Sequence, residues 1–172
     1  MRILEKYAKR KLLRKAKLLK RIPELPNFKT FKKVGVIWQP DQKNAFLFLQ
    51  DYFSKKKIIF RSLCVFEENS EIVVDANSLT PKDLNWMRFP KPGKINGFTE
   101  MDFDLLLNLA LVQNITLDYI TLITRAKFKT GWSPDENNFF DLNINISQNR
   151  DSLYLAKQQI FYLRQLNKTN NK

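Results

Sequence analysis

The stretch FDLLLNLAL at residues 103–111 decides the fold, because seven of its nine side chains are apolar. A strand with one face in water alternates apolar and polar residues, whereas a nearly continuous apolar run is typical of a strand buried on both faces. Such strands occur in parallel sheets whose two faces are covered by helices. The stretch therefore predicts a protein of the α/β class.

Strand-like and helix-like segments alternate upstream of this stretch. The run VGVIW at residues 34–38 predicts a second buried strand, and residues 44–53 carry apolar side chains at helical spacing. Further strands are predicted at residues 58–66 and 72–74. The segment TPKD at residues 80–83 combines a capping hydroxyl, a proline and an acid three residues on, which is typical of a helix start.

The same alternation continues downstream. Thr116 is expected to cap a helix at about residues 117–126, and a short strand that contains Phe128 follows. Alternating apolar and polar side chains at residues 141–146 predict a half-buried strand at an edge of the sheet, before a final helix at about 151–166. Strands that alternate with helices pair in parallel through right-handed crossovers. We therefore predict a single open, mostly parallel, Rossmann-like sheet.

Positive charge is concentrated at the N-terminal end of the chain. Residues 1–33 hold 13 basic and 2 acidic residues, a net charge of +11, while the whole chain carries +13. Residues 2–22 place apolar side chains at three- and four-residue spacing without Gly or Pro, which predicts a basic amphipathic helix that ends before Pro23. We expect a helical arm at 1–22, a Pro-containing basic linker at 23–33, an α/β domain at 34–166 and a polar tail at 167–172.

Three interpretations of the arm remain open. Lysine and arginine side chains can neutralise the phosphates of RNA, an anionic membrane can attract them, or the helix can dock on the domain and leave its charges in water. We favour a non-enzymatic protein that binds RNA, on or near the ribosome, with binding separable from folding of the domain. The candidate contacts are Arg2, Lys6, Lys9, Arg10, Lys11, Arg14, Lys15, Lys17, Lys20, Arg21, Lys29, Lys32 and Lys33.

The segment WMRFPKPGK at residues 86–94 interleaves aromatic and cationic side chains within a predicted irregular loop at 86–98. This composition suits stacking on unpaired bases. The alternative is that Trp86 and Phe89 plug the core. The basic segment FKTFKK at residues 28–33 raises the same question, and we expect it to share one cationic surface with the arm.

A small-ligand site is a second hypothesis. Ligands of open α/β sheets bind beyond the carboxyl ends of the strands, where Gln39, Asp41, Asn108 and Trp132 are expected to lie. The first strand is not followed by a glycine-rich turn, so the backbone there is not suited to hold a phosphate closely. The acids around Phe103 precede their strand, and we interpret them as a strand cap.

Composition narrows the possible chemistry. The chain has no histidine and one cysteine, Cys64, which rules out Ser-His and Cys-His pairs, histidine metal sites and an internal disulfide. We expect Cys64 to be a small buried residue, and we expect no cofactor or metal. The N-terminal stretch lacks the apolar run of a secretory signal, and no stretch has 18 consecutive apolar residues. A cytoplasmic location is therefore expected.

Three segments carry a family resemblance: TPKDLNW at residues 80–86, FDLLLNL at 103–109 and LITRAKFKTG at 122–131. Together they resemble an uncharacterised bacterial family of small proteins with a "KDxxW…FDLLI…AKFKVG" pattern, which implies no activity. Residues 103–131 are also similar to the N-terminal half of heptosyltransferase-type glycosyltransferases. That likeness implies shared fold ancestry, and it makes a degenerate glycosyltransferase-like protein an alternative.

Overall fold

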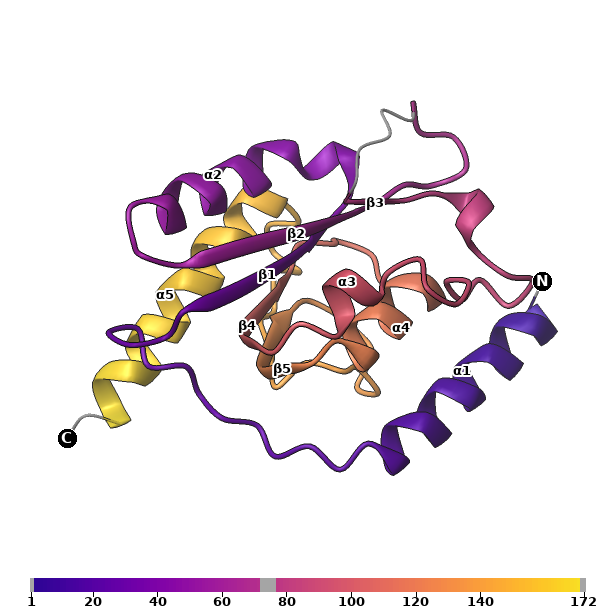
Figure 1. Ribbon diagram of the computed structural model, residues 1–172, viewed down its shortest axis with the longest axis horizontal. Helices are drawn as coiled ribbons and strands as arrows, with labels where there is room; N and C mark the ends of the chain where they lie inside the picture. Colours follow the sequence, from indigo (N-terminus) through magenta and orange to yellow (C-terminus); the bar gives the residue numbers. More distant parts are fainter. Residues whose placement is uncertain (1, 72–76, 171–172) are drawn as a thin grey trace.

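The computed structural model describes residues 2–71 and 77–170. Within them the strands form one open six-stranded sheet of order β3-β2-β1-β4-β5-β6, and all five strand pairs are parallel (Figure 1). This is the strand order of Rossmann folds, so the predicted α/β class and parallel sheet are confirmed. The strands are β1 (Lys33–Trp38), β2 (Ile59–Val65), β3 (Ser78–Leu79), β4 (Phe103–Asn108), β5 (Ala126–Gly131) and β6 (Leu142–Asn143).

Helices cover both faces of the sheet (Figure 1). Leu105 and Leu107 of β4 join the core cluster that contains residues of α2 and α5, while Leu106 joins the cluster that contains residues of α3 and α4. Successive side chains of a strand point to opposite faces, so an apolar run is buried on both sides. The helices are α1 (Arg2–Leu18), α2 (Lys43–Ser54), α3 (Asn96–Thr99), α4 (Ile115–Ile123) and α5 (Ser152–Asn170), with short 3-10 helices η1 (Pro40–Gln42) and η2 (Pro81–Asp83).

Two contacts explain how β1 and β4 fit together. A Cβ atom on Gly35 would lie 2.9 Å from the ring of Phe103, so the absence of a side chain makes room for that ring. Asp104 accepts hydrogen bonds from the backbone N–H groups of Lys32 (2.8 Å) and Lys33 (3.0 Å) at the start of β1. Asp104 therefore caps the neighbouring strand β1, although it lies within β4 and not before it as expected.

The start of α4 differs from the prediction. Asn114, rather than Thr116, caps this helix, because its side-chain oxygen accepts a hydrogen bond of 2.9 Å from the backbone N–H of Leu117. Thr116 instead donates its hydroxyl to the carbonyl oxygen of Arg88, at 2.8 Å. The helix also ends earlier than predicted, at Ile123, because the chain is extended again from Ala126 in β5.

Other boundaries also shift. TPKD forms the 3-10 turn η2 with a capping box between Thr80 and Asp83, and the chain becomes extended at Leu84 instead of continuing into an α-helix. The edge strand β6 is shorter than predicted, because Ile144 and Ile146 turn inward against Trp132. Helix α5 extends to Asn170, so the first part of the predicted polar tail is helical. The predicted strand at 72–74 lies outside the described residues.

Candidate nucleic-acid interface

Helix α1 is docked on the body of the protein. Its only buried side chains are Ala8 and Leu12, each 1% exposed, and they form a small core cluster with Phe89 and Ile115. Figure 1 shows α1 lying beside α4, to which it makes its main contact. The predicted amphipathic helix is confirmed, and it uses its narrow apolar stripe to pack on its own domain. It ends at Leu18, before the boundary expected near Pro23.

One cation of α1 holds the helix to the domain. Lys9 forms an ion pair with Asp135, in the loop that follows β5. The partly buried Asp118 of α4 lies close to this ion pair. Its pKa is raised to about 6, mainly by burial; the Lys9 charge acts to lower it and the Asp135 charge to raise it. All three line a cavity of about 260 Å³ under α1, together with Trp132. Lys9 is therefore engaged by the protein itself.

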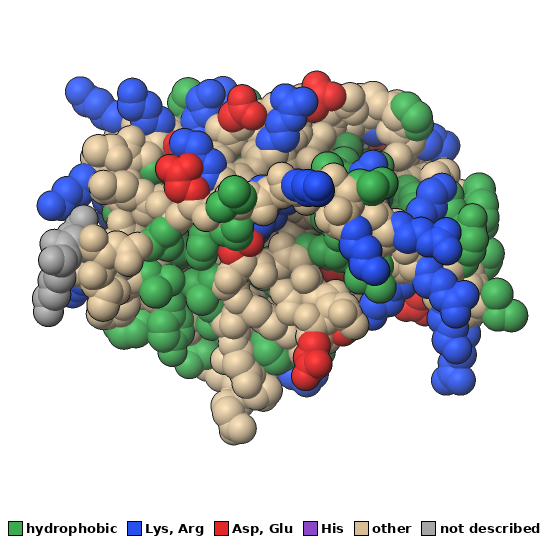
Figure 2. All heavy atoms as spheres, turned by 90° about the horizontal axis from the view of Figure 1, so that it is seen from below, with side chains coloured by type: hydrophobic (Ala, Val, Ile, Leu, Met, Phe, Trp, Pro, Cys, Tyr) green, Lys and Arg blue, Asp and Glu red, His purple; other side chains and the backbone are tan. Residues whose placement is uncertain are grey.

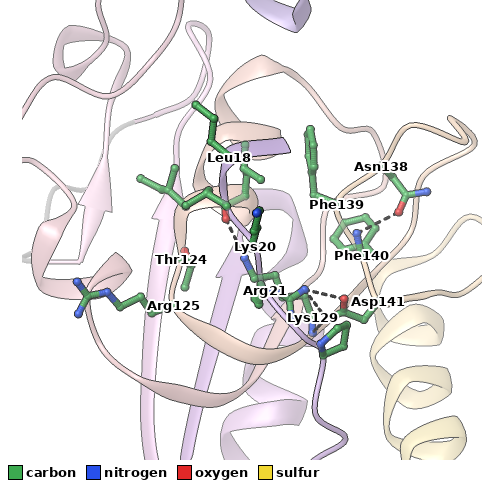
Figure 3. Close-up of a pocket in the computed structure, with 14 residues that line it drawn as sticks. Leu18, Lys20, Arg21, Thr124, Arg125, Lys129, Asn138, Phe139, Phe140 and Asp141 are labelled. Carbon is green, nitrogen blue, oxygen red and sulfur yellow. Dashed lines mark hydrogen bonds and ion pairs between the residues drawn. The ribbon is translucent and has the colours of Figure 1, made fainter. Parts of the chain in front are cut away.

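A second attachment follows the helix, where the chain turns along the domain (Figure 3). The guanidinium of Arg21 donates two hydrogen bonds to the Asp141 carboxylate, at 2.6 and 2.7 Å, and one to the carbonyl oxygen of Lys127, at 3.0 Å. The backbone N–H of Glu24 then donates to the same carbonyl oxygen, at 2.9 Å. Both bonds to the carboxylate come from Nη2, while Nη1 donates to the carbonyl group, so the two ends of the guanidinium are held by different partners. Arg21 is thus an anchor of the arm.

A buried lysine lies beside this anchor. The ammonium of Lys129, a residue only 2% exposed, donates to the carbonyl oxygens of Thr121 (2.7 Å) and Leu122 (2.9 Å) in the last turn of α4. Burial lowers the pKa of Lys129 to about 7 with the help of the Arg21 charge, while Asp141 acts to raise it. Lys129 and Arg21 both line an open cavity of about 600 Å³ between arm and domain.

The outward face of α1 is strongly cationic (Figure 2). Lys6, Arg10 and Arg14 follow one another at four-residue spacing, opposite the buried Ala8 and Leu12, and Lys17 lies on the same side of the helix. Within the described residues none of them has an acidic partner. The exposed basic residues of α1 without such a partner are Arg2, Lys6, Arg10, Lys11, Arg14, Lys15 and Lys17, which we call the α1 ridge.

The remaining candidate cations lie elsewhere. Lys20 is exposed beside Arg21, whereas Lys29, Lys32 and Lys33 lie at the other end of the molecule, where the chain enters β1 (Figure 1). The backbone N–H of Phe28 donates to the side-chain oxygen of Asn167 in α5, at 3.0 Å. The expectation that this segment and the arm share one cationic surface is therefore wrong, because the linker carries it across the whole domain.

A basic patch that sequence reasoning missed forms at that end. Five cations line an open hollow of about 850 Å³ between α2, α5 and the linker, and no acid lines it. One of them, Lys55, pairs with exposed Asp51 on α2. In the sequence these residues are too far apart to suggest a cluster. We call them the α5 patch: Lys29, Lys55, Lys56, Arg164 and Lys168.

The predicted ligand crevice is occupied by the protein's own side chains. The side-chain amide of Asn108 donates to Gln113 and Thr121, and its oxygen accepts from the backbone N–H of Ala110. Gln159 of α5 bridges the ends of two strands by donating to the carbonyl oxygens of Asn108 (3.1 Å) and Thr130 (3.3 Å). These bonds use both polar atoms of the Asn108 side chain, whereas Gln159 Oε1 and Thr130 Oγ1 are buried without a hydrogen-bond partner among the described residues.

The other three residues predicted to line the crevice, Gln39, Asp41 and Trp132, do not all lie together. Gln39 is buried and donates to Glu67 at 3.0 Å, while Asp41 is exposed on η1. Gln113 links Asn108 to Trp132 by donating to the carbonyl oxygen of Trp132, at 3.0 Å. Asn108 and Trp132 are thus connected through Gln113, on the β4 side of β1. Gln39 is bonded instead to Glu67, which follows β2 on the other side of β1.

Comparisons with known proteins give one match. The model of a family of unknown function, DUF6913, matches residues 2–166. No curated protein and no solved structure matches the chain. The resemblance to an uncharacterised family is therefore confirmed, whereas the heptosyltransferase likeness gains no support. Because the match begins at residue 2, α1 is part of the unit that the family defines.

Proposed function

Because the chain belongs to DUF6913, a family without an assigned function, we propose from the structure itself that the protein binds RNA through the α1 ridge. The observation that carries this proposal is that docking turns the cationic side of α1 outward, while Ala8 and Leu12 are buried. A row of unpaired basic side chains attracts the phosphates of a nucleic acid and releases their counterions. No catalytic step is involved.

The docked state favours a polyanion over a membrane. An amphipathic helix on a membrane inserts its apolar side, and in this protein the apolar stripe of α1 already packs against Phe89 and Ile115. Membrane insertion would therefore require α1 to leave the domain, whereas phosphates can bind the ridge as it stands. In addition, no helix in the described part of the chain is long and apolar enough to cross a bilayer.

Charge neutralisation tests the proposal better than deletion of the arm. Removing residues 1–21 would expose Phe89 and Ile115, so lost binding could reflect a damaged domain. We therefore substitute four exposed cations of α1 by glutamine and measure the affinity for a fluorescent RNA over a series of salt concentrations. The variant carries Lys6→Gln, Arg10→Gln, Arg14→Gln and Lys17→Gln.

The variant is expected to bind RNA more weakly and with a shallower salt dependence. If each cation neutralises one phosphate, the slope of log K against log salt falls by about three. A control with the same charge change on other exposed lysines should keep most of the affinity: Lys43→Gln, Lys57→Gln, Lys82→Gln and Lys157→Gln. Equal losses in both variants, or binding to anionic vesicles but not to RNA, would contradict the proposal.

A further inference from the structure

An exposed tryptophan lies at the N-terminal part of α1. The side chain of Trp86 is 65% exposed, and its ring stacks against Tyr7 of α1 with centroids 6.4 Å apart and an interplanar angle of 16°. Tyr7 itself is 52% exposed. A large aromatic side chain usually gains stability by being buried, so an outward-facing stacked pair indicates a surface that meets a partner.

Hydrogen bonds between side chains and the backbone fix the conformation of the loop that carries Trp86. The side-chain oxygen of Asn85 accepts hydrogen bonds from the backbone N–H groups of Met87 (2.9 Å) and Phe89 (3.1 Å). Arg88 has a φ of 67°, an unfavourable backbone conformation for a side chain of its size, and Thr116 holds its carbonyl oxygen. These contacts turn Phe89 inward and leave Trp86 outside.

A groove with both apolar and cationic walls lies next to this pair, lined by Asn85 and Met87, the two chain neighbours of Trp86. It has a volume of about 240 Å³ and runs between α1 and the Trp86 loop, with Lys11 and Lys15 on the helix side. Phe89 and Tyr119 stack beneath it, with centroids 4.7 Å apart. No acid lines the groove. We call the groove together with Tyr7 and Trp86 the aromatic seam.

We infer that the aromatic seam binds single-stranded RNA, with an unpaired base stacked on Trp86 and the adjoining phosphates on Lys11 and Lys15. The inference rests on the proposed function and adds the class of RNA. Every base has a flat face that can stack on an indole ring, whereas the bases of a duplex are already stacked on each other. The lysines beside the groove supply charge of the sign that phosphates require.

The test compares two RNA probes of equal length, an unstacked oligouridylate and a perfect duplex, against the full chain and Trp86→Ala. Loss of one stacked base is expected to weaken single-strand binding about tenfold and to change duplex binding less than about twofold. Trp86→Phe should retain most of the affinity, because a phenyl ring can also stack. The control Phe161→Ala removes another exposed aromatic side chain, from α5, and should bind both probes as the unaltered chain does.

Intrinsic fluorescence gives an independent readout. Of the three tryptophans, Trp132 is buried and Trp38 is partly buried, so quenching by a stacked base should come mainly from Trp86. The inference is overturned if Trp86→Ala loses both probes equally, or neither, while the full chain still binds RNA. If the full chain binds neither probe, the proposed function itself fails. Thermal unfolding of each variant verifies that the domain is intact.

Discussion

At the scale of single residues, burial and pairing separate cations that look alike in the sequence. Lys9 and Arg21 are engaged by Asp135 and Asp141, whereas Arg10 and Arg14, on the same arm, have no acidic partner in the described chain. Lys129 is also engaged by the protein, because its ammonium group is buried and donates to two carbonyl oxygens. A count of basic residues therefore overestimates how many can contact RNA.

The first residue-scale prediction concerns Asp118. Its folded pKa of about 6 lies above the unfolded value of 3.8, so the folded state binds more protons between these values. Its contribution to stability is therefore largest below about pH 4 and falls as the pH rises to 6. Asp118→Asn should stabilise the protein at pH 7.5, by at most about 3 kcal/mol, and have little effect near pH 3.5.

Urea unfolding at several pH values measures this effect. Asp51→Asn is a matched control, because Asp51 is exposed on α2 and only pairs with Lys55 at the surface. It should show no such pH-dependent gain. A lower free energy of unfolding for Asp118→Asn at pH 7.5 would mean that the Lys9 charge outweighs the cost of burying the carboxylate.

At the scale of elements, α1 shows how a short apolar stripe orients a charged helix. Ala8 and Leu12 are the only residues of α1 that are fully buried, so the docking depends on one and a half turns. The ion pair of Lys9, within the helix, and the hydrogen bonds of Arg21 to Asp141, just after the helix, add two further attachments. The helix therefore presents its basic ridge in one fixed direction.

Leucine substitutions test this docking. Leu12→Ala should lower the free energy of unfolding by about 2–3 kcal/mol, because it removes buried contacts with Phe89 and Ile115. Leu18→Ala, on the same helix at a position 81% exposed, should change it by less than about 0.5 kcal/mol. Hydrogen exchange should also become faster across α1 in Leu12→Ala. Equal effects of the two substitutions would show that α1 is not docked in solution.

At the scale of the whole molecule, exposed basic residues gather at two separate places. The elements that carry them, α1 on one side and α5 on the other, lie far apart in Figure 1. Helix α1, which carries the α1 ridge on its outward face, packs beside α4, and the α5 patch lies where α2, α5 and the linker meet. Residues 19–32, between the end of α1 and the start of β1, connect the two places. An RNA longer than the domain could contact both, whereas a short RNA would occupy one end at a time.

Combining substitutions at the two ends tests this arrangement. Neutralising the α5 patch with Lys55→Gln, Lys56→Gln, Arg164→Gln and Lys168→Gln should weaken binding of a long RNA, and the loss should add to that from the α1 variant. Additivity within about 0.5 kcal/mol is expected for sites that share no contacts. The same four substitutions should leave binding of a short RNA nearly unchanged, and a large loss there would place the principal site at the α5 patch.

The sequence predicted the fold more fully than the site. Apolar runs such as residues 103–111 and 34–38 indicate buried strands by themselves, and their alternation with helices implies parallel pairing. The sequence also located the positive charge and singled out Trp86 and Phe89, but it could not tell which of the two faces outward. It missed the α5 patch, whose members come from the turn after α2, from α5 and from the linker.

The sequence by itself determined the α/β class, the central strands and the basic amphipathic helix, because each depends on the spacing of neighbouring side chains. Only the tertiary structure decided that α1 packs on its own domain, that Lys9 and Arg21 anchor it there, and that Trp86 faces the solvent. The reason is physical: each of these outcomes depends on partners supplied by distant segments. Asp135 lies 126 residues from Lys9, and Asp141 lies 120 residues from Arg21.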